Sequence, residues 1–202
     1  FSNSYSQQDV NGWYWLNGKP TGNTLAWVKI VDPANIYAVG DRGTFMKSTD
    51  GGDTWSINNS VGSPDNSETG NLQTRPLNTG WFFNANTGFV AGQSISSTPG
   101  YISRTTDGGI TWSYVQYSNT GGTIRKMHFI NSNTGFMTGN ANARLYKTTD
   151  AGLTWTNISN VNGFPLDDFS SVYAIDENNI YLASNANKNV YHYTTANGWT
   201  TS

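Results

Sequence analysis

The amino-acid sequence predicts an all-β protein made of four repeated units, each with four antiparallel strands. Three observations predict it: a short motif that recurs along the chain, paired apolar segments between its copies, and the lack of apolar residues at helical spacing. A length of 202 residues suits one domain of this kind. We therefore expect strands throughout and no amphipathic helix.

The recurring motif is a polar turn that ends in tryptophan. It reads STDGGDTW at 48–55, TTDGGITW at 105–112 and TTDAGLTW at 148–155. A worn, shorter copy at 194–199 lacks the aspartate. The motif positions that we single out are Ser48, Asp50, Gly52, Trp55, Thr105, Asp107, Gly109, Trp112, Thr148, Asp150, Gly152 and Trp155.

Between the motifs, each unit reads as two short apolar strands, a third strand that leads into the motif, and a fourth that begins at the tryptophan. In the first unit the first three strands are expected at 27–30, 36–40 and 44–47. Segments rich in Asn, Asp and Gly join the first two strands, and these residues favour tight turns. The later pairs are 81–83 with 88–92, 127–129 with 135–139, and 172–175 with 180–183.

Four strands in a repeat of about 40–45 residues are typical of a β-propeller blade. We therefore predict a single four-bladed β-propeller over residues 1–202, with repeats at about 13–54, 55–111, 112–154 and 155–198. Few residues follow Trp199, so an N-terminal strand at about 10–16 is expected to complete the last blade. The residues of this strand exchange are Trp13, Tyr14, Trp15 and Trp199. The strand either closes the ring within one chain, which leaves no exposed edge, or joins a neighbouring molecule.

The motif aspartates are expected to act in folding. A short carboxylate accepts hydrogen bonds from the amides of its own turn, glycine adopts positive φ, and tryptophan covers the end of the hairpin. A catalytic residue is needed once, whereas a turn is needed in every blade. The repetition of Asp50, Asp107 and Asp150 thus favours a structural role.

The pattern Ser/Thr-x-Asp-x-Gly-x-Thr-Trp resembles the Asp-box, also called the bacterial neuraminidase repeat. Its wider frame, with Asn-Thr-Gly-Phe at 86–89 and 133–136, is similar to the photosystem II assembly-factor type of propeller. The resemblance covers about residues 10–202. It implies a propeller fold and, taken literally, an assembly factor that docks a membrane-protein partner. Relatives usually have more blades, so the chain is either a compact four-bladed ring or part of a longer propeller.

Composition excludes several classes of function. The chain has no cysteine, so disulfides and thiolate metal sites are excluded. A net charge of −2 argues against a nucleic-acid partner, and no apolar stretch is long enough for membrane insertion. No phosphate loop, dinucleotide fingerprint or zinc spacing occurs, so neither a cofactor nor a metal is expected. Only 12% of residues are charged, and Phe1 opens the chain without a leader. Both features suggest a secreted or cell-surface bacterial protein whose signal peptide has been removed.

Candidate binding residues lie in loops. The second repeat is longer than the others, and long loops on a rigid scaffold are where binding functions tend to lie. The candidate loop residues are Asp65, Glu68, Asp167 and Asp168. No catalytic set is evident, so we predict a non-catalytic interaction or structural module whose partner is a protein, another copy of itself or a glycan. The alternative is a carbohydrate-binding module or a degenerate glycoside hydrolase.

Overall fold

The computed structural model describes residues 21–59, 61, 75–93, 100–115, 122–140, 145–159 and 163–201. These residues form four antiparallel sheets of four strands each, together with the single-turn 3-10 helix η1 (Asp41–Gly43). The predicted all-β fold with four four-stranded blades is therefore confirmed. In the same described part, no helix is long and apolar enough to cross a bilayer.

Each sheet is a meander in which every strand pairs with the next one in sequence. Sheet one contains β1 (Leu25–Ile30), β2 (Ile36–Gly40), β3 (Thr44–Ser48) and β4 (Ser56–Asn58). Sheet two contains β5 (Leu77–Phe82), β6 (Gly88–Gly92), β7 (Ile102–Thr105) and β8 (Ser113–Tyr114). Sheet three contains β9 (Ile124–Phe129), β10 (Gly135–Gly139), β11 (Leu145–Thr148) and β12 (Thr156–Asn157). Sheet four contains β13 (Phe169–Asp176), β14 (Asn179–Ser184), β15 (Val190–Thr194) and β16 (Gly198–Thr201).

The last sheet differs from the expectation because it has its own fourth strand. Strand β16 pairs with β15, with Gly198 opposite Thr194 and Thr201 opposite Tyr191. Gly198 has a φ of 65°, so the chain reverses over three residues and the strand starts before Trp199 rather than after it. The place predicted for the N-terminal strand is thus taken by β16. Residues 10–16 themselves lie outside the described part of the chain.

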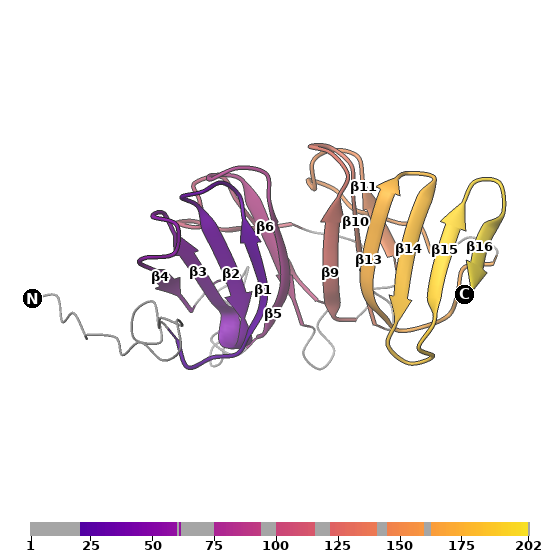
Figure 1. Cartoon of the computed structure of the whole chain (residues 1–202), viewed down its shortest axis with the longest axis horizontal. Helices are drawn as coiled ribbons and strands as arrows, with labels where there is room; N and C mark the ends of the chain where they lie inside the picture. Colours follow the sequence, from indigo (N-terminus) through magenta and orange to yellow (C-terminus); the bar gives the residue numbers. More distant parts are fainter. Residues whose placement is uncertain are drawn as a thin grey trace, which may run out of the picture.

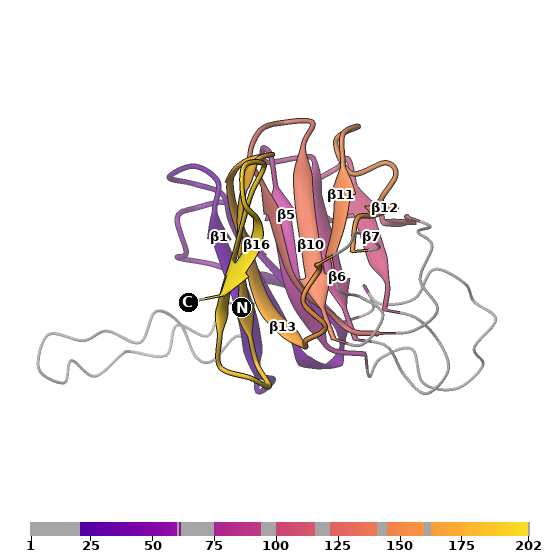
Figure 2. The same cartoon turned by 90° about the vertical axis from the view of Figure 1, so that its right-hand side faces the viewer.

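The four sheets stand face to face in a row (Figure 1). Their first strands are neighbours in the order β1, β5, β9, β13, and sheets one and four lie at opposite ends of the row. Figure 2 looks along this row, with β16 in front and β1 behind. Within the described residues the four blades therefore form a row that does not close into a ring, and we call this arrangement the open fan.

Aromatic rings fill the joints between neighbouring sheets. In the first joint the rings of Tyr37 and Phe82 stack with centroids 3.9 Å apart and planes 5° apart. In the second, Phe89 of β6 lies parallel to Phe129 of β9. The third joint buries Phe136 of β10 against Ile180 of β14. The core is consequently divided into layers between blades, which is how a propeller buries its sheets.

Candidate functional site

The Asp-box turns of the first three blades share one set of hydrogen bonds. In the first, the Gly52 amide donates to Ser48 Oγ at 2.8 Å and the Thr54 amide donates to Asp50 Oδ1 at 2.9 Å. The indole Nε1 of Trp55 donates to the Gly52 carbonyl at 3.0 Å. Equivalent bonds recur at 105–112 and 148–155. The box carboxylates therefore serve as acceptors within their own turns.

These hydrogen bonds also set the charge of the box carboxylates. The Thr54 hydroxyl and amide lower the pKa of Asp50 to about 2, and those of Thr111 do the same for Asp107. An acid of such low pKa is ionised at neutral pH and is a poor proton donor. The structural role of the box remains a prediction, and acid unfolding tests it.

Acid is expected to weaken the fold between about pH 4 and pH 2. The pKa of Asp107 is about 2 in the folded chain against an ordinary 3.8, so its stabilisation is present above pH 3.8 and is lost as pH falls through 2. Urea unfolding midpoints measured at pH 7, 4 and 2.5 should fall in that window. The Asp107→Asn variant should be less stable at pH 7 and show a smaller fall. An unchanged pH dependence in this variant would contradict the assignment.

The second and third boxes also cover the joint with the preceding blade. The box amides of Gly108 and Ala151 donate to the carbonyls of Asn86 and Asn133, which lie in the first turn of the same blade. The box glycines then lie against aromatic rings of the blade before. A Cβ on Gly109 would come within 2.3 Å of Phe45, and one on Gly152 within 2.6 Å of Phe89. The box thereby closes the end of the apolar layer between blades.

The fourth blade lacks this cover. Its worn motif forms the β15–β16 turn, and its β13–β14 turn is also tight, because Asp176 pairs with Asn179. A cleft of about 290 Å³ opens at the joint between blades three and four. Its apolar lining includes Phe136, Leu145, Ile180, Tyr193 and Trp199. Phe136 holds the register position in sheet three that Phe89 holds in sheet two; both rings are fully buried, and a box glycine lies against Phe89.

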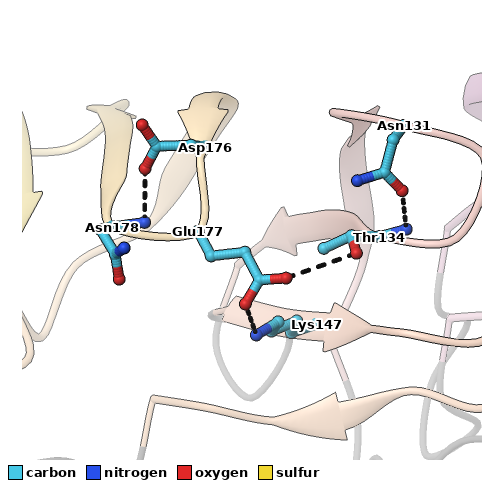
Figure 3. A network of polar contacts seen from close by, with 6 residues as sticks. All are labelled: Asn131, Thr134, Lys147, Asp176, Glu177 and Asn178. Carbon is cyan, nitrogen blue, oxygen red and sulfur yellow. Dashed lines mark hydrogen bonds and ion pairs between the residues drawn. The ribbon is translucent and has the colours of Figure 1, made fainter.

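The lining of this cleft also includes a charged pair from two blades, which Figure 3 shows. Lys147 Nζ of β11 contacts Glu177 Oε2 in the β13–β14 turn at 2.8 Å. The Thr134 hydroxyl donates to the other oxygen of Glu177 at 3.4 Å. Hydrogen bonding and the charge of Lys147 lower the pKa of Glu177. The cleft thus combines an apolar lining, which includes three aromatic side chains, with a charged pair.

Of the sequence-predicted loop residues, the two that the structure describes, Asp167 and Asp168, do not line this cleft. Asp167 is only 8% exposed, and its Oδ2 accepts hydrogen bonds from the Tyr191 hydroxyl at 3.0 Å and the Asn187 side chain at 2.8 Å. Asp168 follows it, and its amide donates to Asp167 Oδ1. These contacts connect Asp167 to its own blade. The other candidates, Asp65, Glu68, Trp13, Tyr14 and Trp15, lie outside the described residues.

Of the predicted residues, the structure places Trp199 in the cleft, beside Tyr193 at 5.2 Å between ring centroids. Sequence reasoning missed Lys147 and Glu177 as a pair, because they come from different blades. A signal for the cleft was present in the sequence: the last motif is shorter than the others and lacks the aspartate. Among the described residues, no three His, Asp or Glu side chains are grouped as a metal site would require.

Comparisons with known proteins identify the family. The model of the family described as "Photosynthesis system II assembly factor YCF48" matches residues 6–200. The chain belongs to this family. No curated protein matches it. A structure of YCF48 bound to D1 peptide matches this chain with 20% identity and a TM-score of 0.66. The match covers 90% of this chain and 55% of the YCF48 chain. YCF48 from Cyanidioschyzon merolae has 21% identity and a TM-score of 0.65, with 91% and 57% covered.

The chain therefore spans little more than half the length of the YCF48 structures that it matches. The structure of an ancestral GH74 enzyme is also similar, at 20% identity and a TM-score of 0.65, with 88% of this chain and 25% of the enzyme covered. At such identities these likenesses show the propeller fold alone, and one fold hosts unrelated activities.

The family match corrects the predicted location. The low share of charged residues had suggested a secreted or cell-surface protein. That prediction is wrong, because the family to which the chain belongs is described as photosystem II assembly factors and not as secreted or cell-surface proteins.

Proposed function

We propose that this YCF48-family chain is a non-catalytic protein-binding module that takes a bulky apolar side chain of a peptide into the cleft between blades three and four. The observation that carries the proposal is the cleft itself, which opens where the Asp-box cover is missing. Phe136 and Leu145 are fully buried beneath the cleft, and the half-buried Tyr193 and Trp199 offer aromatic surface to a ligand. Aromatic side chains in apolar pockets are typical centres of protein interfaces.

The comparisons support a protein partner. One YCF48 structure is bound to a D1 peptide, which makes a D1 segment the first candidate ligand for this chain. The volume of about 290 Å³ lies at the lower limit of ligand pockets, which run from about 300 to 1,000 Å³. Such a space suits one side chain of an extended segment better than a whole folded partner. The peptide backbone would then pass the charged pair of Lys147 and Glu177.

The chemistry of the cleft argues against glycoside hydrolysis there. A glycosidase uses two carboxyl groups, about 5–10 Å apart, one of which acts as an acid. Among the described residues that line the cleft, Glu177 is the one carboxylate. Its ion pair with Lys147 lowers its pKa, the opposite of what a general acid needs. We therefore place the chain among binding modules rather than enzymes.

Overlapping peptides that span the D1 protein provide the test. At least one peptide should bind the wild-type chain in fluorescence anisotropy, and its scrambled version should not. Loss of a central aromatic contact costs about 2 kcal/mol or more, so the Trp199→Ala variant should raise the Kd at least about 30-fold. The Ile110→Ala variant is the matched control, because Ile110 is an exposed apolar side chain at a different blade, and it should bind like wild type.

Two results would contradict the proposal. Equal affinity of wild-type and Trp199→Ala chains for a D1 peptide would place binding elsewhere on the protein. Binding of xyloglucan oligosaccharides but of no D1 peptide would favour the carbohydrate-binding alternative, since Trp199 and Tyr193 could also stack on sugar rings. Circular dichroism of both variants checks that each has kept its strands.

A further inference from the structure

The outer strand of the fourth blade begins earlier than the outer strands of the other three blades. Strands β4, β8 and β12 each begin directly after the tryptophan of their Asp-box, whereas β16 begins at Gly198, one residue before Trp199. Thr200 holds the place of Ser56 and Ser113, because the hydroxyl of each donates to a third-strand carbonyl of its own blade. Without a box, the outer strand therefore runs further toward its turn and includes Trp199.

The outer edge of β16 has no strand neighbour within the described residues. In sheet four β16 pairs with β15 alone, and no arrow lies beyond it in Figure 1. Alternate residues of such an edge point their N–H and C=O groups away from the sheet, where a further strand can pair with them. Proteins blunt such edges with very short strands, lysine, proline or a bulge.

Strand β16 carries none of these protections. The outer strands of the first three blades have two or three residues, whereas β16 has four. Its sequence, Gly-Trp-Thr-Thr, contains no lysine or proline, and its register with β15 is regular. Thr200 and Thr201 are exposed. This edge can therefore accept an added strand.

The accessibility of this edge does not depend on how many blades the whole protein has. In the open fan the first strands are neighbours, and the fourth strand of sheet four lies furthest from its first strand. Further blades of a propeller pack on the faces of a sheet and leave its outer edge at the periphery. The edge of β16 thus stays open in a longer propeller as well.

A row of side chains leads from the core of sheet four to this edge. Ala174, Ile180, Tyr193 and Trp199 lie opposite one another in successive strands. Ala174 and Ile180 are buried in the cluster that contains Phe136 of sheet three. Tyr193 and Trp199 are half-buried and line the cleft. A strand added beyond β16 would continue this row, because opposite residues of paired strands project to the same face.

We infer that the ligand peptide binds in an extended conformation, as a fifth strand of sheet four along the outer edge of β16. The inference rests on the proposed function and adds the conformation of the ligand. The peptide residue opposite Trp199 directs its bulky apolar side chain toward the cleft, and backbone hydrogen bonds to β16 hold the segment. In strand addition, main-chain hydrogen bonds give affinity and pockets for alternate side chains give specificity.

This binding mode defines the class of peptide that fits. The segment has one bulky apolar residue for the cleft. The residues on either side of it in sequence point to the opposite face of the sheet and can be polar. Proline is excluded wherever the peptide amide faces β16, because proline has no N–H to donate.

An N-methyl scan of the D1 peptide that binds tightest in the anisotropy series tests the inference. Each version carries a methyl group on one backbone amide, which removes a donor and separates the strands if that amide faces β16. Every second version should raise the Kd about 10-fold or more, and the versions between should bind like the unmodified peptide.

Amide hydrogen exchange of the full chain locates the added strand. At saturating peptide, the outward-facing amides of β16 should gain protection in NMR spectra. The amides of β8 (Ser113–Tyr114) are the matched control, because this outer strand belongs to another blade, and they should exchange as in the free chain.

The outcomes separate this inference from the proposed function. Equal Kd values for all N-methylated versions, or losses at consecutive positions, would overturn strand addition, while weak binding by the Trp199→Ala variant would still support the cleft. An alternating pattern without protection of β16, together with wild-type affinity in Trp199→Ala, would place the peptide on another sheet and overturn both. The absence of any binding D1 peptide would also overturn both.

Discussion

Gly109→Ala is expected to destabilise the protein by about 2–5 kcal/mol, far more than an ordinary glycine substitution. Gly109 has a φ of 90°, and a left-handed backbone costs an L-residue about 1–2 kcal/mol. The new Cβ would also come within 2.3 Å of the buried Phe45 ring in the preceding blade. Overpacking of this kind adds about 1–3 kcal/mol. Urea unfolding, followed by tryptophan fluorescence, measures the total change in the free energy of unfolding.

A substitution at a second glycine separates the cost of the left-handed backbone from the cost of overpacking. Gly198 also has a positive φ, of 65°, but nothing lies within 4 Å of the Cβ that a substitution would add. The Gly198→Ala variant should therefore lose only the backbone part, about 1–2 kcal/mol. Equal losses in the two variants would mean that the Phe45 ring moves aside and that the box does not close the joint as described.

Sequence reasoning works well for the Asp-box because its contacts are local. Ser48 accepts a hydrogen bond from an amide four residues away, and Asp50 from the amide of Thr54, again four residues away. Strand number and order follow for the same reason, since every strand pairs with its neighbour in sequence. Because the turn hydrogen bonds and the strand pairings of the repeated unit are local, the blade can be predicted from the sequence alone.

The cleft could not be predicted in the same way because its parts come from different blades. Lys147 and Glu177 are separated by 30 residues and meet only when blades three and four pack. The start of β16 depends on the φ of Gly198, which shifts the strand to include Trp199. The exposure of Val28 and Ile30 in sheet one also could not be predicted from the sequence. Val28 and Ile30 have the alternation of core residues, and only the position of sheet one shows that nothing in the described chain covers them.

Tyr37→Ala should have the largest effect on the joint between blades one and two. The Tyr37 ring is completely buried and stacks on Phe82, and its hydroxyl donates to the Ala85 carbonyl at 2.6 Å in the next blade. Truncation of a buried aromatic side chain costs about 3–5 kcal/mol. Blade one has a neighbour on one side only within the described residues, and in a repeat architecture stability is largely a sum of neighbour contacts. The loss should therefore detach blade one before the others unfold.

Limited proteolysis and urea unfolding together distinguish this outcome from uniform weakening. In the Tyr37→Ala chain, cleavage within residues 21–59 should precede cleavage elsewhere, and the urea transition should broaden or divide in two. The Tyr37→Phe variant keeps the stacked ring and loses only the hydrogen bond, so it should cost about 0.5–1.5 kcal/mol and keep a single transition. If Tyr37→Ala instead unfolds in one sharp step with all sites cleaved together, the four blades form one cooperative unit. The joint would then contribute to the stability of all four blades together, and blade one would not detach on its own.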